Sequence, residues 1–320
     1  MSKELGIVLY RGPSQLDGKL IVCIATGFSG SKNVKTGNLI QTWIMRADID
    51  PLTVHANNWD ESICGQCFYK NTDSCYVNIG QAPYGVYMAD CRRRYVEFDY
   101  NKHKDLFINR SMRIGSYGDP TSVPVKVWQQ FLPLLKGFSG YSHQWRNPKF
   151  QDYKHFCMAS LEKPQDYDKA KKLGWRTFRV KPLSSEIVNK NLLEPKDENG
   201  EKDNTKEDFF QYWKKLQQKG YNQIFGTEIL CRASDKYAEM YEGKKLTCEQ
   251  CGLCCGDKIS GPDIVIDFHG FGSNSYKYKN FVKCLSKIEG KKGWKKPDIK
   301  KKKRKKVKKV VKKVDNLVVV

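Results

Sequence analysis

The stretch that decides the fold begins with Met112-Arg113-Ile114-Gly115-Ser116-Tyr117, a predicted strand that is ended by Gly118-Asp119-Pro120. Beyond it, helical and strand-like patterns alternate up to residue 180. We predict helices at 125–135, 148–154 and 165–173, and strands at 140–145, 156–161 and 175–180. Strands that alternate with helices of about ten residues indicate right-handed crossovers and a parallel sheet. The fold class is therefore α/β, and three such units fit part of a barrel or a doubly wound sheet.

The segments on either side of this repeat complete the predicted architecture. Residues 1–110 are predicted to form an N-terminal β segment of the same core, because the apolar runs 19–26 and 39–45 favour an antiparallel pair. A helix is expected at 84–95. The βα-repeat domain, residues 111–288, further contains a predicted surface loop at 193–206, an amphipathic helix at 208–218 and strands at 224–230 and 264–268. Residues 289–320 form a lysine-rich tail, which is predicted to be disordered because its like charges repel each other.

The composition favours a folded protein of a reducing compartment. The 320 residues are 39% hydrophobic and 12% aromatic, which is enough for a sizeable core. No apolar run is long enough to cross a membrane, and the N-terminus lacks the apolar stretch of a secretory signal. We therefore expect a cytoplasmic protein without a membrane partner, in which the twelve cysteines are thiols or metal ligands rather than disulfides.

The positive charge is concentrated at the C-terminal end. Of the net charge of +22, residues 291–320 contribute +13, from fifteen Lys or Arg against Asp298 and Asp315, and the remaining residues contribute +9. A flexible polycation binds nucleic acid without reading its sequence, through the release of counterions. The densest run, and the predicted nucleic-acid contact, is Lys300, Lys301, Lys302, Lys303, Arg304, Lys305 and Lys306. Alternatively, the tail is a localisation signal.

Seven of the cysteines form two clusters with the spacing of metal ligands. The first cluster is Cys64, Cys67 and Cys75, and the second is Cys248, Cys251 and Cys254, with Cys231 upstream. Random placement would give roughly 0.4 Cys-x2-Cys pairs, whereas the chain has three. Two intervening residues let a tight turn direct two thiolates at one ion. Metal binding is therefore favoured over buried, inert cysteines, which are common in protein cores.

The two clusters differ in the number of thiolates that they offer. Cys231 follows a predicted strand and can join the second cluster in a closed structural site with four thiolates. The first cluster supplies three, so that the fourth position is either open, as in a reactive centre, or filled by a distant residue such as Cys91 or a histidine. The spacing is compatible with Zn2+ and with a [4Fe-4S] cluster.

Polar side chains recur where the predicted parallel strands end. In parallel α/β folds, ligands bind at the carboxyl ends of the strands. Asp119, His143 and Glu162 each follow a strand of the repeat, and we predict that they face a substrate over the first cluster. Each also has a structural explanation, since Gly118-Asp119-Pro120 is a common turn and His143 is compatible with a semi-buried, hydrogen-bonded position.

Several motifs in combination resemble a known family. The motifs are Cys64-x2-Cys67-x7-Cys75 with the following Tyr76–Pro83, Gly115–Pro120, Tyr141–Trp145, Leu173–Val180 and the second cluster. From about Arg11 to His269, the chain resembles a family of uncharacterised cysteine-rich proteins of phages and mobile elements, which is distantly similar to radical S-adenosylmethionine barrel proteins. The resemblance implies a partial (TIM-like) barrel, an iron–sulfur cluster at the first cluster, S-adenosylmethionine as a candidate cofactor, and the host cell cytoplasm as the location. The spacing Cys-x2-Cys-x7-Cys departs from the Cys-x3-Cys-x2-Cys of that larger group, which argues against adenosylmethionine cleavage.

Two hypotheses of different classes follow. The leading one is a virus-type metalloprotein of unknown reaction, an iron–sulfur enzyme of the radical type. The alternative is a non-catalytic, zinc-stabilised nucleic-acid-binding protein, in which the basic tail supplies the affinity. The metal and the colour of the purified protein discriminate between them.

Overall fold

The computed structural model describes residues 5–30, 35–70, 74–182, 204–243, 245–256, 260–268 and 276–288. The chain divides into two compact units, residues 1–289 and 290–320. All described residues belong to the first unit, so the predicted tail at 289–320, with Lys300–Lys306, lies outside them. The same is true of most of the predicted loop at 193–206 and of His269.

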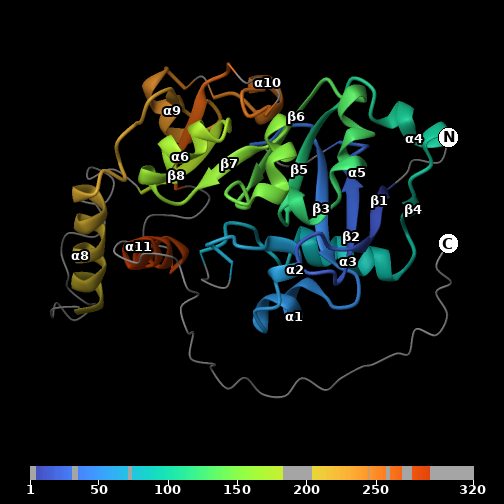
Figure 1. Ribbon diagram of the computed structural model, residues 1–320, viewed down its shortest axis with the longest axis horizontal. Helices are drawn as coiled ribbons and strands as arrows, with labels where there is room; N and C mark the ends of the chain where they lie inside the picture. The colour runs from blue at the N-terminus through green and yellow to red at the C-terminus, as the bar shows by residue number, and fades with distance from the viewer. Residues whose placement is uncertain are drawn as a thin grey trace. The chain divides into compact units, whose positions relative to one another are not determined.

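Within the described part of the chain, ten strands form one sheet in the order β4-β1-β2-β3-β5-β6-β7-β8-β10-β9 (Figure 1). β1 with β2 and β2 with β3 are antiparallel, and each neighbouring pair from β3 to β9 is parallel, as is β1 with β4. The strands are β1 Gly6–Pro13, β2 Leu20–Thr26, β3 Ile40–Arg46, β4 Val96–Glu97, β5 Ser111–Tyr117, β6 Gly137–Ser142, β7 Met158–Leu161, β8 Thr177–Lys181, β9 Glu228–Leu230 and β10 Asp263–Asp267. The mixed α/β class, with an antiparallel N-terminal pair ahead of a parallel repeat, is confirmed.

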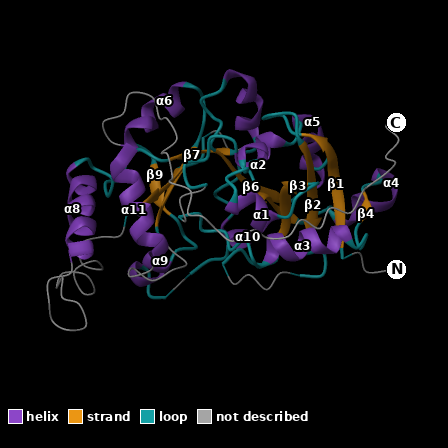
Figure 2. Ribbon diagram, turned by 90° about the horizontal axis from the view of Figure 1, so that it is seen from below, coloured by secondary structure: helices purple, strands orange, loops and turns teal. Residues whose placement is uncertain are grey.

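Helices cover both faces of the sheet (Figure 2). α5 (Val125–Gln129) and α6 (Tyr167–Lys172) lie over one face, where Trp128 and Ala170 are buried in the main hydrophobic core. α9 (Asp235–Met240) and α10 (Cys248–Cys251) lie over the other face. The other helices are α1 Pro51–Ala56, α2 Glu61–Cys64, α3 Ala82–Cys91, α4 Tyr100–His103, α8 Asn204–Gln218 and α11 Tyr276–Ile288, with 3-10 helices η1 Lys104–Leu106, η2 Pro120–Ser122, η3 Leu132–Leu134, η4 Pro148–His155 and η5 Pro164–Asp166.

Strand β5 shows how the sequence separates the two faces. Successive side chains of a strand point to opposite sides of the sheet. Met112 and Ile114 are fully buried in the main core, on the face that α5 and α6 cover. Arg113, between them, contacts Tyr76 and Tyr141 on the other face. The positively charged side chain of Arg113 therefore lies on the face of the sheet that α10 covers.

Several predicted elements differ from the observed ones: the strand expected at 224–230 comprises only Glu228–Leu230, the helix expected at 84–95 ends at Cys91, and the helix expected at 148–154 is the 3-10 helix η4. Two further differences have clear local reasons. β6 ends at Ser142 rather than at residue 145, because the Asp119 carboxylate accepts hydrogen bonds from the Ser142 hydroxyl and the His143 N–H and draws the chain out of the sheet. The predicted helix at 125–135 is divided into α5 and η3. Pro133 lies at the start of η3, and its missing N–H cannot continue the hydrogen bonds of α5.

A second hydrophobic core joins α8 and α11 to the segment around the first cluster. Trp213 and Leu216 of α8 and Phe281 of α11 are buried together with Phe68 and Tyr69. The rings of Tyr69 and Phe281 are stacked, with centroids 5.8 Å apart. α11, which belongs to the far end of the chain, therefore covers the residues that follow Cys67.

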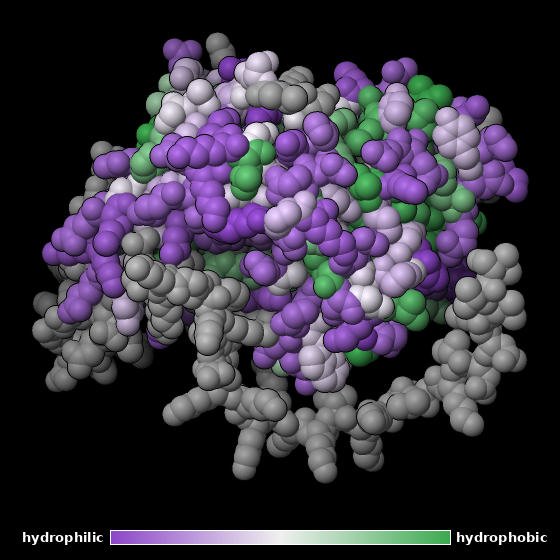
Figure 3. Space-filling model, viewed as in Figure 1, coloured by the Kyte–Doolittle hydropathy of each residue, from purple (hydrophilic) through white to green (hydrophobic). Residues whose placement is uncertain are grey.

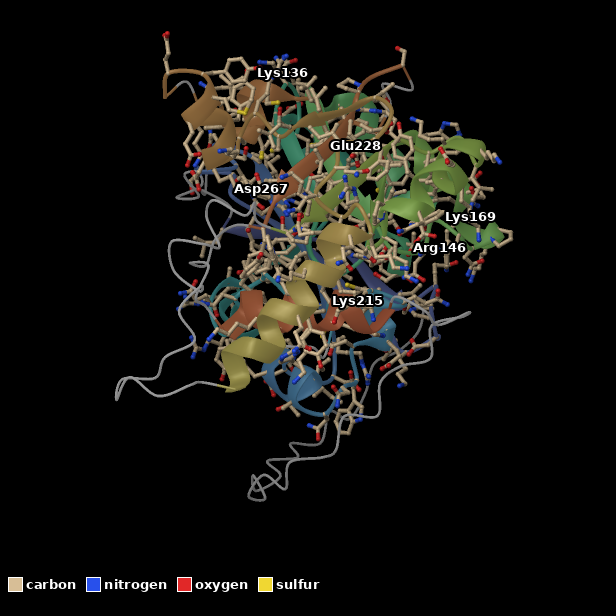
Figure 4. All side chains as sticks on the ribbon, turned by 90° about the vertical axis from the view of Figure 1, so that its left-hand side faces the viewer. Lys136, Arg146, Lys169, Lys215, Glu228 and Asp267 are labelled. Atoms are coloured by element: carbon tan, nitrogen blue, oxygen red, sulfur yellow. The ribbon has the colours of Figure 1, made fainter. Side chains whose placement is uncertain are left out.

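A buried ion pair connects β8 with β9. Arg179 donates to both carboxylate oxygens of Glu228, at 2.9 and 2.7 Å, and to the carbonyls of Tyr221 and Gln223. The two side chains are 1% and 0% exposed. Figure 4 shows Glu228 among the side chains of the interior, whereas Lys169 lies at the periphery. The contacts identify Arg179 as a structural residue of the sheet.

The face of the molecule seen in Figure 3 is mainly hydrophilic, with hydrophobic residues visible chiefly on its right-hand side, over β1 to β3 and α5. Among the described residues, no helix combines the length and the apolar character that a membrane span requires.

Candidate functional site

The first cysteine site comprises Cys64, Cys67 and Cys75. α2 ends at Cys64, and Gly65 then adopts a φ of 50°, a left-handed value that glycine tolerates. A Cβ at Gly65 would collide with the side chain of Gln144. The turn therefore requires glycine both for its backbone angle and for lack of space. The turn closes with a hydrogen bond of 2.9 Å from the Cys67 N–H to the Cys64 carbonyl. Both Cys67 and Cys75 act electrostatically on the Cys64 thiol, so the three cysteines are neighbours in space.

Asp119 attaches this site to the carboxyl ends of β5 and β6. Its N–H donates to the carbonyl of Ile63, directly before Cys64, at 2.6 Å. Its carboxylate accepts hydrogen bonds from Thr121, from the Ser142 hydroxyl and from the His143 N–H, the last at 2.8 Å. The residue is only 4% exposed. These contacts give Asp119 a positioning role, because its oxygens are occupied by the two loops that it joins.

His143 and Glu162, which the sequence places at the ends of successive strands, meet at this site. The Nδ1 of His143 lies 2.6 Å from Oε1 of Glu162. The Cys67 thiol lies close enough to act electrostatically on the same ring, and the Tyr69 ring lies edge-on at 5.9 Å. Both side chains are largely buried. His143 therefore lies between the Glu162 carboxylate, to which it is hydrogen-bonded, and the Cys67 thiol.

The electrostatics of the first site follow from burial and from these contacts. Burial alone would lower the pKa of His143, but Cys67 and Glu162 raise it well above its usual value. Burial alone would raise the pKa of Glu162, yet the hydrogen bond to His143 and the charge of Arg146 lower it. Burial, with Asp60 and the other cysteines, raises the pKa of the Cys64 thiol well above its usual value. Such a thiol keeps its proton near neutral pH unless a metal cation replaces it.

The hydroxyl of Tyr117 is buried beside the same thiols. Tyr117 ends β5 and is 3% exposed. Burial and the charges of Cys64, Asp60 and Cys75 raise the pKa of its phenol well above the usual value. Within the described residues the hydroxyl has no hydrogen-bond partner. An unsatisfied buried donor costs about 1–3 kcal/mol, so an acceptor next to Cys64 and Cys75 would stabilise the protein.

The second cysteine site comprises Cys231, Cys248, Cys251 and Cys254. Cys231 follows β9, and α10 carries two of the others behind a capping box of Thr247 and Gln250. The left-handed Gly252 then turns the chain toward Cys254. All four cysteines line one cavity. Burial raises the pKa of the Cys254 thiol, and the charges of the other three cysteines raise it further.

Two cations and a tyrosine surround the second site. Arg113 lies between the rings of Tyr76 and Tyr141, at 5.9 and 6.0 Å from their centroids, and donates to the Tyr76 hydroxyl at 2.7 Å. The charges of Cys248 and Cys254 act on the guanidinium of Arg113. Burial lowers the pKa of Lys35 to about 8, whereas the charges of Cys231 and Cys248 act in the opposite direction. Tyr141 lines the same cavity as Cys254 and lies close enough to act electrostatically on its thiol.

The sequence patterns did not indicate Lys35, Arg113 or Tyr141 as site residues. The signal for Arg113 was present, since it is the one charged residue of an otherwise uncharged strand. The direction in which it points becomes interpretable only when β6 and α10 are in place. Cys255, next to Cys254, is buried and accepts a hydrogen bond from the Phe138 N–H at 3.3 Å. Cys91 is exposed at the end of α3.

As the side chains lie, no group of three or more His, Cys, Asp or Glu residues within the described ranges could hold a metal ion. The two sites therefore bring the predicted ligands together without showing coordination geometry. No family model, curated protein or solved structure matches the chain. Its function has to be inferred from these sites alone.

Proposed function

We propose that the protein is a metal-dependent enzyme in which Cys64, Cys67 and Cys75 hold an iron–sulfur cluster with one open iron position that faces His143 and Glu162. The observation that carries this proposal is the hydrogen bond of 2.6 Å between His143 and Glu162, beside the Cys67 thiol. Three thiolates leave one position for a substrate. An imidazole on that side exchanges a proton with the substrate, and the carboxylate orients the imidazole.

The position of the first site in the fold supports this proposal. It lies where β5, β6 and β7 end, which in parallel α/β proteins, including partial barrels, is the edge that binds ligands. The stacked rings of Tyr69 and Phe281 cover it with an apolar surface that excludes water. The hydroxyl of Tyr117 supplies a buried donor for a metal-bound thiolate or a ligand. Hydrogen bonds of this kind tune the potential of iron–sulfur clusters.

Metal analysis tests the proposal directly. Protein purified without oxygen is expected to be brown and to contain iron and sulfide, because charge transfer from sulfur to iron colours these clusters. Cys67→Ser is expected to lose the colour, since it removes one of three ligands, whereas Cys91→Ser at the exposed end of α3 should keep it. Colourless protein with zinc at these cysteines would contradict the proposal and favour the zinc-stabilised alternative.

His143→Gln distinguishes an open centre from a closed one. If His143 acts on a substrate at an open position, the variant should bind as much iron as the native protein and still bind an external ligand such as cyanide at the cluster. If His143 is itself the fourth ligand, with Glu162 orienting its other nitrogen, the variant should lose the metal. His155→Gln, on an exposed residue, is the matched control. Loss of iron from His143→Gln but not from the control would exclude the open position.

A second activity, sequence-independent binding of nucleic acid, is favoured by the +13 charge of residues 291–320. Deleting these residues is expected to weaken binding to DNA of arbitrary sequence at least ~10-fold at low salt, because each phosphate contact releases counterions. The slope of the logarithm of the binding constant against that of the salt concentration should move toward zero. Titrations of the full and shortened chains at two salt concentrations measure both effects. If the full and shortened chains bind DNA with equal affinity, residues 1–290 account for the binding.

A further inference from the structure

The chain passes from α3 to β4, the edge strand of the sheet, through three consecutive arginines (Figure 1). α3 is followed directly by Arg92, Arg93 and Arg94. The N–H of Arg93 donates to the Asp90 carbonyl at 2.8 Å, and the N–H of Arg94 donates to the Ala89 carbonyl at 3.1 Å. These two bonds form the Schellman motif, a helix end that the backbone alone makes.

Arg93 occupies the position of this motif that glycine normally takes. Its φ of 53° is left-handed, a conformation in which the Cβ of other residues lies too close to the backbone. The two backbone bonds would form equally well with glycine, and with less strain. The helix dipole does not require a cation at this position either, because Arg92 and Arg94 already place two at the end of α3. A strained conformation that folding does not require points to a function for the guanidinium group.

The three guanidinium groups are exposed, and their charges are not balanced by the protein. Within the described part of the chain, none of them takes part in an ion pair or a hydrogen bond. The two carboxylates that flank the turn in the sequence, Asp90 and Glu97, are both bound by Arg11, at 2.8 and 3.3 Å. Three positive charges therefore remain available on one surface turn.

The phosphates of a nucleic acid fit this turn better than an acidic protein does. A guanidinium group is a planar fork that matches two phosphate oxygens, and it stays charged at all physiological pH values. An interface with an acidic protein would normally bury an apolar centre as well. Among the described residues 82–99, however, Val96 is the only exposed large hydrophobic residue. Contact with a nucleic-acid backbone needs charge alone.

We propose that Arg92, Arg93 and Arg94 form a phosphate-contact site for nucleic acid. The site contacts the backbone and not the bases, so it binds without reading the sequence. It is separate from the lysine-rich residues 291–320, and it rests neither on the cysteine sites nor on the proposed reaction. Each arginine that meets a phosphate releases counterions, so the three arginines set part of the salt dependence of binding.

The test measures binding of the full chain to fluorescently labelled DNA of arbitrary sequence at several salt concentrations. The triple variant Arg92→Gln/Arg93→Gln/Arg94→Gln is expected to bind about tenfold more weakly at low salt, because three phosphate contacts are lost. The slope of the logarithm of the binding constant against that of the salt concentration should move toward zero by about 2–3, since each lost contact contributes about 0.9.

The matched control is the triple variant Lys136→Gln/Lys169→Gln/Lys172→Gln. These lysines are exposed and carry the same total charge, but they belong to other segments of the chain. The control should keep the native salt slope to within about 1, because its charges make no phosphate contacts of their own.

Arg93→Gly separates binding from folding. Glycine relieves the left-handed strain, so the midpoint of urea denaturation should stay the same or rise. The affinity for DNA should nevertheless fall about two- to threefold, because one phosphate contact is lost. Impaired folding cannot account for that result, and Arg93→Gly therefore decides the question even if the triple variant is insoluble.

Three results would overturn the proposal. The first is an equal loss of DNA affinity in the arginine and lysine triple variants, which would reduce the effect to net charge. The second is native DNA affinity in both arginine variants. If deletion of residues 291–320 weakens binding in that case, the tail alone accounts for it. The third is unchanged DNA binding with weaker binding to phosphatidylserine vesicles or to polyglutamate, which would assign the turn to a membrane surface or to an acidic protein.

Discussion

Cys254→Ser is expected to abolish the metal binding that the spacing of the second cysteine cluster predicts, and to lower the free energy of unfolding by on the order of 5–10 kcal/mol. The physical reason is that metal–thiolate bonds contribute directly to folding when the ligands come from separate segments. Cys231 follows β9, whereas Cys248 and Cys254 belong to the α10 segment, so the unfolded chain offers no preformed site. Because a domain is stable by only about 5–15 kcal/mol, much of the variant should be insoluble.

Metal content and urea denaturation of the soluble fraction measure this effect. Cys255→Ser is the matched control: it changes the adjacent cysteine, which accepts the hydrogen bond of the Phe138 N–H, and a hydroxyl can still accept it. The control should keep the metal and lose no more than about 1–2 kcal/mol. A Cys254→Ser protein that is soluble and melts at the native temperature would show that Cys254 is not a structural ligand.

The second large effect is expected at the ion pair between β8 and β9. Arg179→Met should lower the free energy of unfolding by about 3–5 kcal/mol, because it leaves the fully buried carboxylate of Glu228 without its counter-charge. It also leaves the carbonyls of Tyr221 and Gln223 without the guanidinium donor. Denaturation in urea measures the loss.

The double variant Arg179→Met/Glu228→Met separates the charge effect from the packing effect. Replacing both partners by apolar side chains removes the buried charge, so the double variant should be more stable than Arg179→Met alone. Lys236→Met provides the surface comparison, because its pair with Glu239 is partly exposed and should contribute less than about 1 kcal/mol. If Arg179→Met lost no more stability than Lys236→Met, the buried pair would not be a structural element.

Much of the fold could be predicted from local patterns. The antiparallel pair at 19–26 and 39–45 is present as β2 and β3, and the alternation after residue 111 is present as β5 to β8. Period-two and helical spacings are properties of a few consecutive residues, so the sequence shows them directly. The ends of the strands and helices were less predictable. β6, for example, ends where the Ser142 hydroxyl and the His143 N–H donate hydrogen bonds to the carboxylate of Asp119, which belongs to another loop. α11 was not predicted, although Tyr278, Phe281, Val282 and Leu285 have helical spacing, whereas the short α9 gave no clear pattern.

In the candidate sites, too, the features that depend on spacing along the chain could be predicted, and the contacts between distant segments could not. The spacing of Cys64, Cys67 and Cys75 predicted that these residues lie together, and the positions of His143 and Glu162 after successive strands predicted that they lie at one edge. The proximity of Cys67 to the His143–Glu162 pair brings together segments that no local pattern relates. It depends on the order of the strands in the sheet.

By itself, the sequence determined the α/β class, the two groups of cysteines and the polar residues at the strand ends, because each is a matter of spacing along the chain. Only the tertiary structure decided that β10 lies between β8 and β9, that α11 covers the first cysteine site, and that Lys35 and Arg113 lie beside the second. These arrangements bring together segments up to about two hundred residues apart, as when the Asn38 N–H donates to Glu249. Such contacts form because they bury apolar surface and pair buried charges, and those gains depend on the whole packed core rather than on any one segment.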